Sequence, residues 1–318
     1  MMIAYILYVM TTTHTHRGLV WIDLQSPNDK EIGDVVKRYG LNPLVGEELK
    51  DSPSSAKVNF YKDYILVVMT LPVRVHAGES YEIVDREVDF VIGKNFLITS
   101  RTETIEQLEY FAKIFDANAA LDKDSAIEHA GHLFYYIVQR IYNGMFQDLE
   151  NIRDALRLAE SHIFNGDEKK MVEVLSFLSR ELIDFKQTAH SHHDVWSELT
   201  TFTEKSDLFG NEFYSYVHTI KDESSHINET IVNARELLAD LRETNDALLN
   251  TKQNEIIKVL TLISFIFYPL TFIASVFTIP GINVPLTQSR YGWWIIDGIM
   301  LLVAIGIAVY FNRKGWVK

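Results

Sequence analysis

Two long apolar runs close to the C-terminal end constrain this chain more than any other feature. Val259–Ile279 contains no charged residue, and Trp293–Phe311 contains only Asp297. A helix that crosses the ~30 Å hydrocarbon layer of a membrane needs about 20 consecutive apolar residues. Both runs reach that length, so we predict two transmembrane helices, at residues 259–279 and 293–311, joined by a short loop.

Basic residues predict how these helices are oriented. Because there are two spans, the regions before the first and after the second lie on the same side of the membrane. The loop between the spans carries only Arg290. The basic residues that flank the spans on their other sides are Lys252, Lys258, Arg313, Lys314 and Lys318. The positive-inside rule therefore places both termini and the large remainder in the cytoplasm, with the spans in the cell (inner) membrane.

The composition of the whole chain excludes several function classes. Its 318 residues include 43 Asp and Glu against 30 Lys and Arg, a net charge of -13. Nucleic-acid binding needs clustered basic residues, so no nucleic-acid partner is expected. The absence of Cys excludes a disulfide framework, thiolate-bound zinc and thiol catalysis. Gly93-Lys94-Asn95 lacks the spacing of a phosphate-binding loop, so no ATPase is indicated and we expect a protein that is not an enzyme.

Residues 1–101 predict a small cytoplasmic α/β domain. Short runs rich in β-branched and aromatic residues predict strands, with a hairpin turn at Gly93-Lys94-Asn95. The predicted strands are Met1–Met10, Leu19–Leu24, Tyr64–Thr70, Val88–Ile92 and Phe96–Thr99. Ser26-Pro27-Asn28-Asp29 predicts the start of a helix that ends at Gly40.

Residues 102–258 predict long helices that lead into the membrane. Breaks are expected near Asn165-Gly166-Asp167 and at Leu208–Asn211. The segment Phe213–Lys258 has no Gly or Pro, and its apolar residues recur every three, four or seven positions, as in a coiled-coil seam. Since no break precedes Val259, stalk and first span are predicted to form one helix. The domains expected are therefore 1–101, 102–258 and the transmembrane part 259–318.

A stripe of hydroxyl groups follows one face of the first span. Its members, spaced by three or four residues, are Thr261, Ser264, Tyr268, Thr271, Ser275 and Thr278. Hydroxyls of this kind let membrane helices pack closely and hydrogen-bond to one another. The same face in several subunits would also line a water-filled pore, and two spans per chain enclose one only in a symmetric oligomer. Both interpretations remain open at this point.

The motifs of this region resemble the CorA family of divalent metal ion channels and transporters, the two-span group with a Gly-x-Asn signature and ZntB-like relatives. In the membrane region the resemblance is carried by Asn254–Thr261, Pro269–Ala274, Gly281-Ile282-Asn283 and the basic ending Asn312–Trp316. In the cytoplasmic region it is carried by Val20–Asp23, Asn42–Val45 and Gly93–Thr99. These motifs occur in the order of the family over nearly the whole chain.

The resemblance implies a homopentameric funnel: an α+β cytoplasmic domain with a long helical stalk plus two transmembrane α-helices. It implies passive Mg²⁺ uptake gated by intracellular Mg²⁺, often with transport of Co²⁺ or Ni²⁺. By carry-over, the selectivity filter is Gly281, Ile282 and Asn283. The implied pore-lining residues are Asn254, Ile257, Leu260, Ser264, Tyr268, Thr271 and Ser275.

Three departures from the family pattern bear on the choice of ion. The signature usually reads Gly-Met-Asn and comes about three residues earlier. The loop Val284–Gly292 has no acidic residue, and Tyr268 replaces a Met that is common in the family. We therefore keep two alternatives: a transporter of zinc or another divalent transition metal (Co²⁺ or Ni²⁺), and a non-conducting membrane-anchored helical scaffold.

A regulatory Mg²⁺ site is also implied by the resemblance. Glu47 and Glu48 match a Glu-Asp pair that helps the family to sense cytoplasmic Mg²⁺. Acidic residues are favoured at helix starts in any case, which is the structural alternative for this pair. The partner carboxylate on the stalk falls near Thr219, which leaves Asp222, one turn on, as a weak candidate ligand.

Several histidines and one further acid are also candidates for a site. His190, His192, His193 and Asp194 have the spacing of metal ligands on a helix, although surface histidines are commoner than sites. His14 and His16 fall in an expected loop. Asp297 lies four residues past Trp293, so an interfacial position is expected for it.

Overall fold

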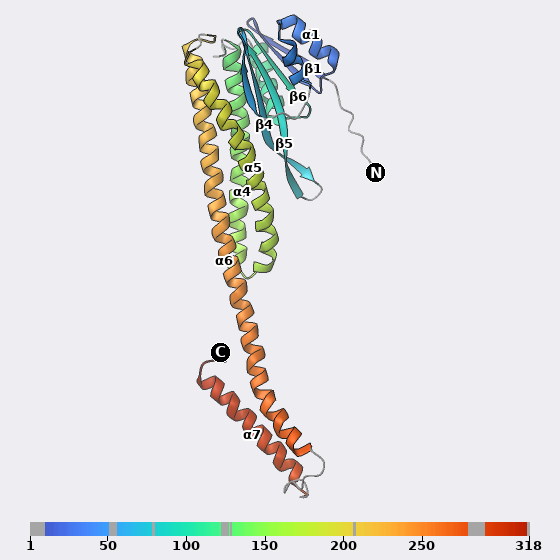
Figure 1. Ribbon diagram of the computed structural model, residues 1–318, viewed down its shortest axis with the longest axis vertical. Coiled ribbons are helices and arrows are strands. Elements are labelled where there is room, and N and C mark those ends of the chain that lie inside the picture. The colour runs from blue at the N-terminus through green and yellow to red at the C-terminus, as the bar shows by residue number, and fades with distance from the viewer. Residues whose placement is uncertain are drawn as a thin grey trace. The chain divides into compact units, whose positions relative to one another are not determined.

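The structure, a computed structural model, describes residues 10–50, 56–77, 80–121, 127, 129–205, 208–278 and 290–316. The chain divides into two compact units, residues 1–242 and 243–318. Figure 1 labels many of their elements. Of the strand predicted at Met1–Met10, only Met10 belongs to the described residues, and it begins β1.

The first unit is built on a sheet of six described strands: β1 (Met10–His16), β2 (Leu19–Gln25), β3 (Lys57–Phe60), β4 (Tyr64–Ala77), β5 (Ser80–Gly93) and β6 (Phe96–Arg101). Their order in space is β1-β2-β6-β5-β4-β3. β2 and β6 are parallel, and the other described pairs are antiparallel. The parallel pair requires a crossover, which the intervening helices and strands supply.

The β4–β5 hairpin is longer than the sequence predicted. Both strands run for 14 residues and pair continuously, so β4 continues through Pro72, which lies opposite Asp85. Proline cannot donate to a ladder and is tolerated where its strand is an edge. β3 pairs with β4 only from Ile65 to Val68, so β4 is an edge at Pro72.

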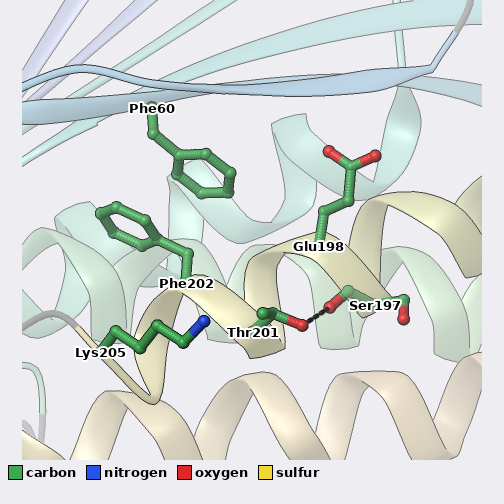
Figure 2. A pocket seen from close by; sticks show the side chains of 6 residues that line it. All are labelled: Phe60, Ser197, Glu198, Thr201, Phe202 and Lys205. Carbon is green, nitrogen blue, oxygen red and sulfur yellow. Dashed lines mark hydrogen bonds between the residues drawn. The ribbon is translucent and has the colours of Figure 1, made fainter.

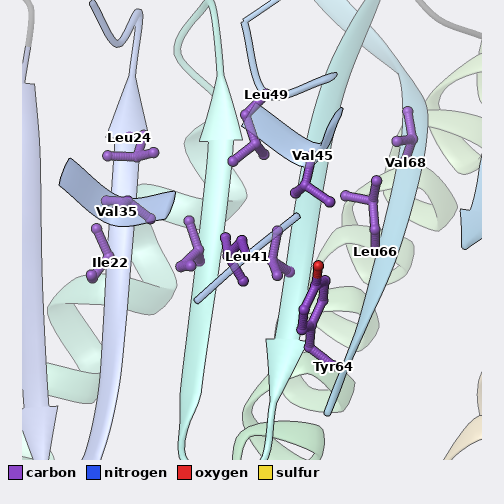
Figure 3. Close-up of a cluster of buried hydrophobic side chains, with 11 residues drawn as sticks. Ile22, Leu24, Val35, Leu41, Val45, Leu49, Tyr64, Leu66 and Val68 are labelled. Atoms are coloured by element: carbon purple, nitrogen blue, oxygen red, sulfur yellow. The ribbon is translucent and has the colours of Figure 1, made fainter. Parts of the chain in front are cut away.

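Two short helices cover one face of the sheet. α1 (Asp29–Tyr39) begins with a capping box between Asn28 and Glu31 and ends at Gly40 in the left-handed conformation, as predicted. α2 (Pro43–Glu48) follows directly. Figure 3 shows the core beneath these helices, where Val45 and Leu49 meet Leu66 and Val68 of β4.

Longer helices cover the other face. α3 (Glu106–Ala120) packs on the β1–β2 side through Trp21 and Phe115, and α4 (Ala130–Phe164) packs on β5 through Phe134 and Phe90. α5 (Glu168–Thr203) returns beside α4 after the predicted break at Asn165-Gly166-Asp167. The two-residue period of the strands explains this division, because Trp21 and Ile22 point to opposite faces.

Stalk and first span form one helix, as predicted. α6 runs from Asn211 to Thr278, 68 residues, with Pro269 inside it. Within the first unit its apolar seam is buried, and its side chains bond to α5: Asn228 donates to the Ala189 carbonyl and Arg242 to the Leu175 carbonyl. The predicted coiled-coil-like pattern is therefore a packing face against the chain's own helices.

The second unit contains the end of α6 and α7 (Gly292–Arg313). Phe265 and Phe311 contact each other with ring centroids 6.0 Å apart, and Leu262 and Phe311 are buried. Both helices are long and apolar enough to cross a membrane. This agrees with the two predicted spans.

Candidate ion pathway and regulatory site

The face of α6 predicted to line a pore lies opposite the face that packs on α7. At 100° per residue, Leu262 and Phe265 mark the α7 side, and Leu260, Ser264, Thr271 and Ser275 project away from it, with Tyr268 at the edge between the two faces. Ile257 and Leu260 are each 58% exposed and Tyr268 is 74% exposed. The single chain therefore leaves this face uncovered.

The hydroxyl groups on and beside this face are hydrogen-bonded to their own helix. Each donates to a backbone carbonyl three or four residues earlier, at 2.6–2.9 Å. The donors are Thr261, Ser264, Thr271, Ser275 and Thr278. Since each hydroxyl has one proton, its oxygen is left with acceptor capacity only. The stripe thus presents hydrogen-bond acceptors to whatever lies in front of it.

The remaining predicted pore residues precede and follow this part of α6 in the sequence. Asn254 is exposed on α6, two turns before the hydroxyl stripe begins. Gly281, Ile282 and Asn283, the predicted filter, lie outside the described residues. Their role remains a prediction.

The structure corrects the setting of Glu47 and Glu48. They were expected at a helix start, but Asn42 caps α2 and Pro43 occupies its first turn, so the two acids end the helix. Carboxylates at a helix C-terminus face the negative end of its dipole. A favourable interaction with the dipole therefore does not explain why these two acids occur there. Glu47 is exposed, whereas the half-buried Glu48 forms an ion pair with Lys57, with Oε2 and Nζ 2.5 Å apart.

A buried carboxylate that the sequence analysis missed lies close to this ion pair. Asp89 of β5 is only 3% exposed, and its Oδ1 has no hydrogen-bond partner. Burial, followed by the charges of Glu87 and Glu48, raises the pKa of Asp89 to about 8. The sequence contains a signal for this residue, because Asp89 interrupts the apolar run Val88–Ile92 on the face that meets α2.

The weak candidate Asp222 is separate from the acids of α2. It is exposed on α6, and its carboxylate lies 3.2 Å from the ring of His218. Its neighbour Glu223 is half-buried, accepts a hydrogen bond from Gln139, and has a pKa raised by burial. Among the residues that the structure describes, no three acidic or histidine side chains are grouped to hold a metal ion.

The histidine cluster on α5 separates into different roles. His192 is fully buried, and its Nε2 donates to the Thr70 carbonyl at 2.7 Å. Its Nδ1 accepts from the Tyr142 hydroxyl at 3.1 Å, which itself accepts from Trp196 at 2.5 Å. Burial lowers the pKa of His192 to about 4. With His190 and His193 exposed, the three rings do not converge, and His192 is a hydrogen-bonded core residue.

The other singled-out side chains are also placed. His14 and His16 lie in strand β1 and not in a loop, because β1 pairs with β2 along its whole length. His14 is buried against Trp21, with a ring nitrogen 2.7 Å from the Asp116 carboxylate. Asp297 is exposed in the second turn of α7.

One surface groove had no counterpart in the sequence analysis. It lies between β3 and the end of α5 and has a volume of about 400 Å³. Figure 2 shows Phe60 stacked on Phe202, with ring centroids 4.1 Å apart, beside Glu198 and Lys205. It contains none of the predicted site residues.

The sequence matches a family of known proteins over most of its length. The family model described as CorA-like Mg²⁺ transporter protein matches residues 16–313. A curated relative, the cobalt/magnesium transport protein CorA of Thermotoga maritima, is 25% identical over 288 residues, 89% of this chain and 80% of the relative. The match confirms the resemblance drawn from the sequence motifs.

Solved structures share the fold. The complete structure of the CorA magnesium transporter from Methanocaldococcus jannaschii has a TM-score of 0.80 at 21% identity, covering 94% of this chain and 92% of that one. The ZntB cytoplasmic domain from Vibrio parahaemolyticus has a TM-score of 0.61 at 11% identity, covering 73% and 88%. The predicted fold, a soluble α+β domain with a long helix and two candidate transmembrane helices, is confirmed.

Proposed function

This chain belongs to the family of CorA-like Mg²⁺ transporter proteins, and from that premise we propose that it forms a homopentameric channel for passive Mg²⁺ uptake across the cell (inner) membrane. Family membership supports a magnesium transporter role. The pentamer, the inner membrane, the cytoplasmic position of both termini and the gating by intracellular Mg²⁺ belong to the proposal.

The observation that carries the proposal is the uncovered, acceptor-bearing face of α6. A pore needs a polar face that the chain itself does not bury, and Ser264, Thr271 and Ser275 provide one opposite α7. Mg²⁺ loses its water ligands reluctantly, so it is best met by groups that accept hydrogen bonds from those waters. Hydroxyls that already donate to their own backbone can accept hydrogen bonds from these waters without binding the ion tightly.

The membrane potential can drive uptake, so no enzymatic reaction is needed to supply energy. For an ion with two positive charges, a membrane potential of 100 mV supplies about 4.6 kcal/mol. The ring expected at Asn283 would select the hydrated ion, since five neutral amides accept hydrogen bonds from its first shell and bind more weakly than carboxylates would. Weak binding favours rapid release.

Gating is proposed to use Glu47 and Glu48, with Mg²⁺ held against a carboxylate of the adjacent subunit. The exposed position of Glu47 at the end of α2 is compatible with a contact outside the chain. Asp222, also exposed, is the weaker candidate for the partner side. If Mg²⁺ is held there, neutralising both acids of α2 should weaken the Mg²⁺-dependent protection of the cytoplasmic domain from protease.

The test of the proposed function is ion flux into liposomes that contain the purified protein. Mg²⁺ entry driven by an inside-negative potential is expected for the wild type, with Zn²⁺, Co²⁺ and Ni²⁺ measured beside it. A preference for Zn²⁺ would favour the transition-metal alternative, and no flux of any ion from an assembled protein would favour a scaffold. With His192 in the core, the histidines no longer favour zinc.

The filter has its own test. Asn283→Ala should leave the oligomer intact, because a short loop contributes little buried surface, and should abolish or sharply reduce Mg²⁺ flux. Asn283→Asp should bind divalent ions more tightly and conduct more slowly. Normal flux through an assembled Asn283→Ala protein would remove this residue from the filter.

A further inference from the structure

The ion pair between Glu48 and Lys57 places a fixed cation on one of the two acids proposed to sense Mg²⁺. Glu48 Oε2 lies 2.5 Å from Lys57 Nζ, and each side chain is about one-third exposed. A pair that is partly withdrawn from water is screened less than a surface pair, so the ammonium lowers the negative charge that Glu48 offers to another ion. Glu47, in contrast, is exposed at the end of α2.

The sheet fixes the position of Lys57. In the ladder, Lys57 of β3 lies opposite Val68 of β4, and Val68 lies opposite Asp89 of β5. Residues opposite one another share a face, and Val68 packs in the core beneath α2. The Lys57 side chain therefore lies on the face that α2 covers, with the buried Asp89 two strands away on the same face.

The surroundings of the pair are acidic and aromatic. The charges of Glu48 and Lys57 both act on the pKa of the Asp89 carboxyl and on the pKa of the Tyr61 hydroxyl. Tyr61 stacks on Tyr64 with ring centroids 4.6 Å apart. The lysine thus lies among Glu48, Asp89 and Tyr61. Since the raised pKa values of Asp89 and Tyr61 keep both groups largely protonated at neutral pH, Glu48 is the anion that balances the charge of the lysine.

We infer that Lys57 is an internal cation that competes with Mg²⁺ for Glu48 and so sets the cytoplasmic Mg²⁺ concentration at which the channel closes. This rests on the proposed regulatory role of Glu47 and Glu48. When Mg²⁺ is low, the ammonium neutralises Glu48. Binding of Mg²⁺ at Glu48 requires the ammonium to leave, and the two cations also repel each other while they are close.

The test removes the competitor from the full-length protein. Lys57→Met keeps the length of the side chain and loses its charge, so the Mg²⁺ concentration that gives half-maximal protease protection should fall by about three- to tenfold. The Mg²⁺ concentration that half-inhibits flux into liposomes should fall in parallel. Lys57→Arg, which retains the charge, should stay close to the wild type.

Lys50→Met is the matched control. Lys50 follows the same helix and pairs with Asp29 at 2.7 Å, so the variant removes a nearby positive charge without releasing Glu48. A shift as large as that of Lys57→Met would show a general electrostatic effect and overturn the inference. An unchanged or higher Mg²⁺ midpoint in a folded Lys57→Met protein would also overturn it.

A further variant separates this inference from the regulatory proposal. In a Glu48→Gln background, Lys57→Met should no longer shift the Mg²⁺ midpoint, because the carboxylate for which the cations compete is gone. A persisting shift would overturn the competition. If the wild type shows no Mg²⁺-dependent protection, the gating proposal fails, and the inference then stands only if Lys57→Met acquires protection; its absence in both overturns the inference.

Discussion

The two halves of α6 carry similar apolar side chains, which are buried in one half and exposed in the other. In the half that belongs to the first unit, Ile220, Ile227 and Ile231 are almost completely buried, with Ile231 at 0% exposure. In the half that belongs to the second unit, Ile256, Ile257 and Leu260 are all more than half exposed. One uninterrupted helix thus changes from a core element into an uncovered one.

The difference shows which half of α6 is packed within the single chain. In the first half, charged residues separate the apolar positions, which is the pattern of a helix with one packed face. Within the second half, the stretch from Val259 to Thr278 has no charged residue, and Leu262 is the one residue of that stretch that is buried. The first half is stabilised by α4 and α5, whereas most of the second is left uncovered by the single chain.

The largest effect is expected from one substitution made in both halves. Ile231→Ala removes a fully buried side chain and should lower the free energy of unfolding by about 3 kcal/mol, since core Ile-to-Ala changes cost 2–5. Ile257→Ala, on the exposed half, should change it by less than about 0.5 kcal/mol. Urea unfolding in detergent, followed by tryptophan fluorescence, measures both. Equal losses would mean that Ile257 is as well packed as Ile231, and the comparison would fail.

Acid should loosen the packed half selectively. The folded His192 has a pKa of about 4, lowered by burial, whereas an unfolded histidine titrates near 6.5. The unfolded state therefore binds a proton that the folded state does not, and stability falls as the pH drops through this window. Between pH 7.5 and pH 5 the contribution of His192 to this loss should be about 2 kcal/mol. Asp89, whose pKa is raised in the folded state, changes stability in the opposite direction and is the same in the variant described next. Because Tyr142 bonds both to His192 and to Ser224 of α6, the loss should reach the packed half of that helix.

His192→Gln isolates this effect. Glutamine can donate to the Thr70 carbonyl and accept from Tyr142, but it does not titrate. The variant should therefore lose less stability between pH 7.5 and pH 5 than the wild type. His129, whose pKa burial also lowers to about 4, is present in both proteins and cancels. Equal pH dependence in the two would exclude His192 as the source.

The smallest effect is expected on the uncovered half. Leu260 has no hydrogen-bonding side-chain group and should contribute to an apolar ring that closes the pore by dewetting. Leu260→Ser should raise Mg²⁺ flux at inhibitory Mg²⁺ by about two- to fivefold. Phe272→Ser, also exposed but to one side of the predicted pore face, is the control. Unchanged flux in an assembled Leu260→Ser protein would locate the gate elsewhere on the face.

Local signals in the sequence predicted much of the fold. The start of α1 at Asn28, the turn at Gly93-Lys94-Asn95 and the break at residues 165–167 are set by neighbouring residues, and all three were found where expected. The unbroken α6 followed from the lack of Gly and Pro before its span. In each case the determining residues lie within a few positions of the feature.

Features that depend on distant contacts were not predictable. The extension of β4 through Pro72 depends on how far β3 reaches along it, and the burial of His192 depends on a carbonyl of β4 that is 122 residues away in the chain. The ion pair of Glu48 likewise requires the pairing of β3 with β4, which brings Lys57 beneath α2. The candidate pore face was predicted as a stripe, but its position opposite α7 required the contact between Phe265 and Phe311.

The self-bonded hydroxyls of α6 have a consequence for the order in which a channel is made. A polar group that enters hydrocarbon without a partner costs free energy, and a pore helix enters the membrane before its neighbours are present. Ser264, Thr271 and Ser275 bring their partners with them, because each donates to a carbonyl of the same helix. A single chain can thus stay in the bilayer with its candidate pore face turned to lipid, so that the proposed assembly can follow insertion as a separate event.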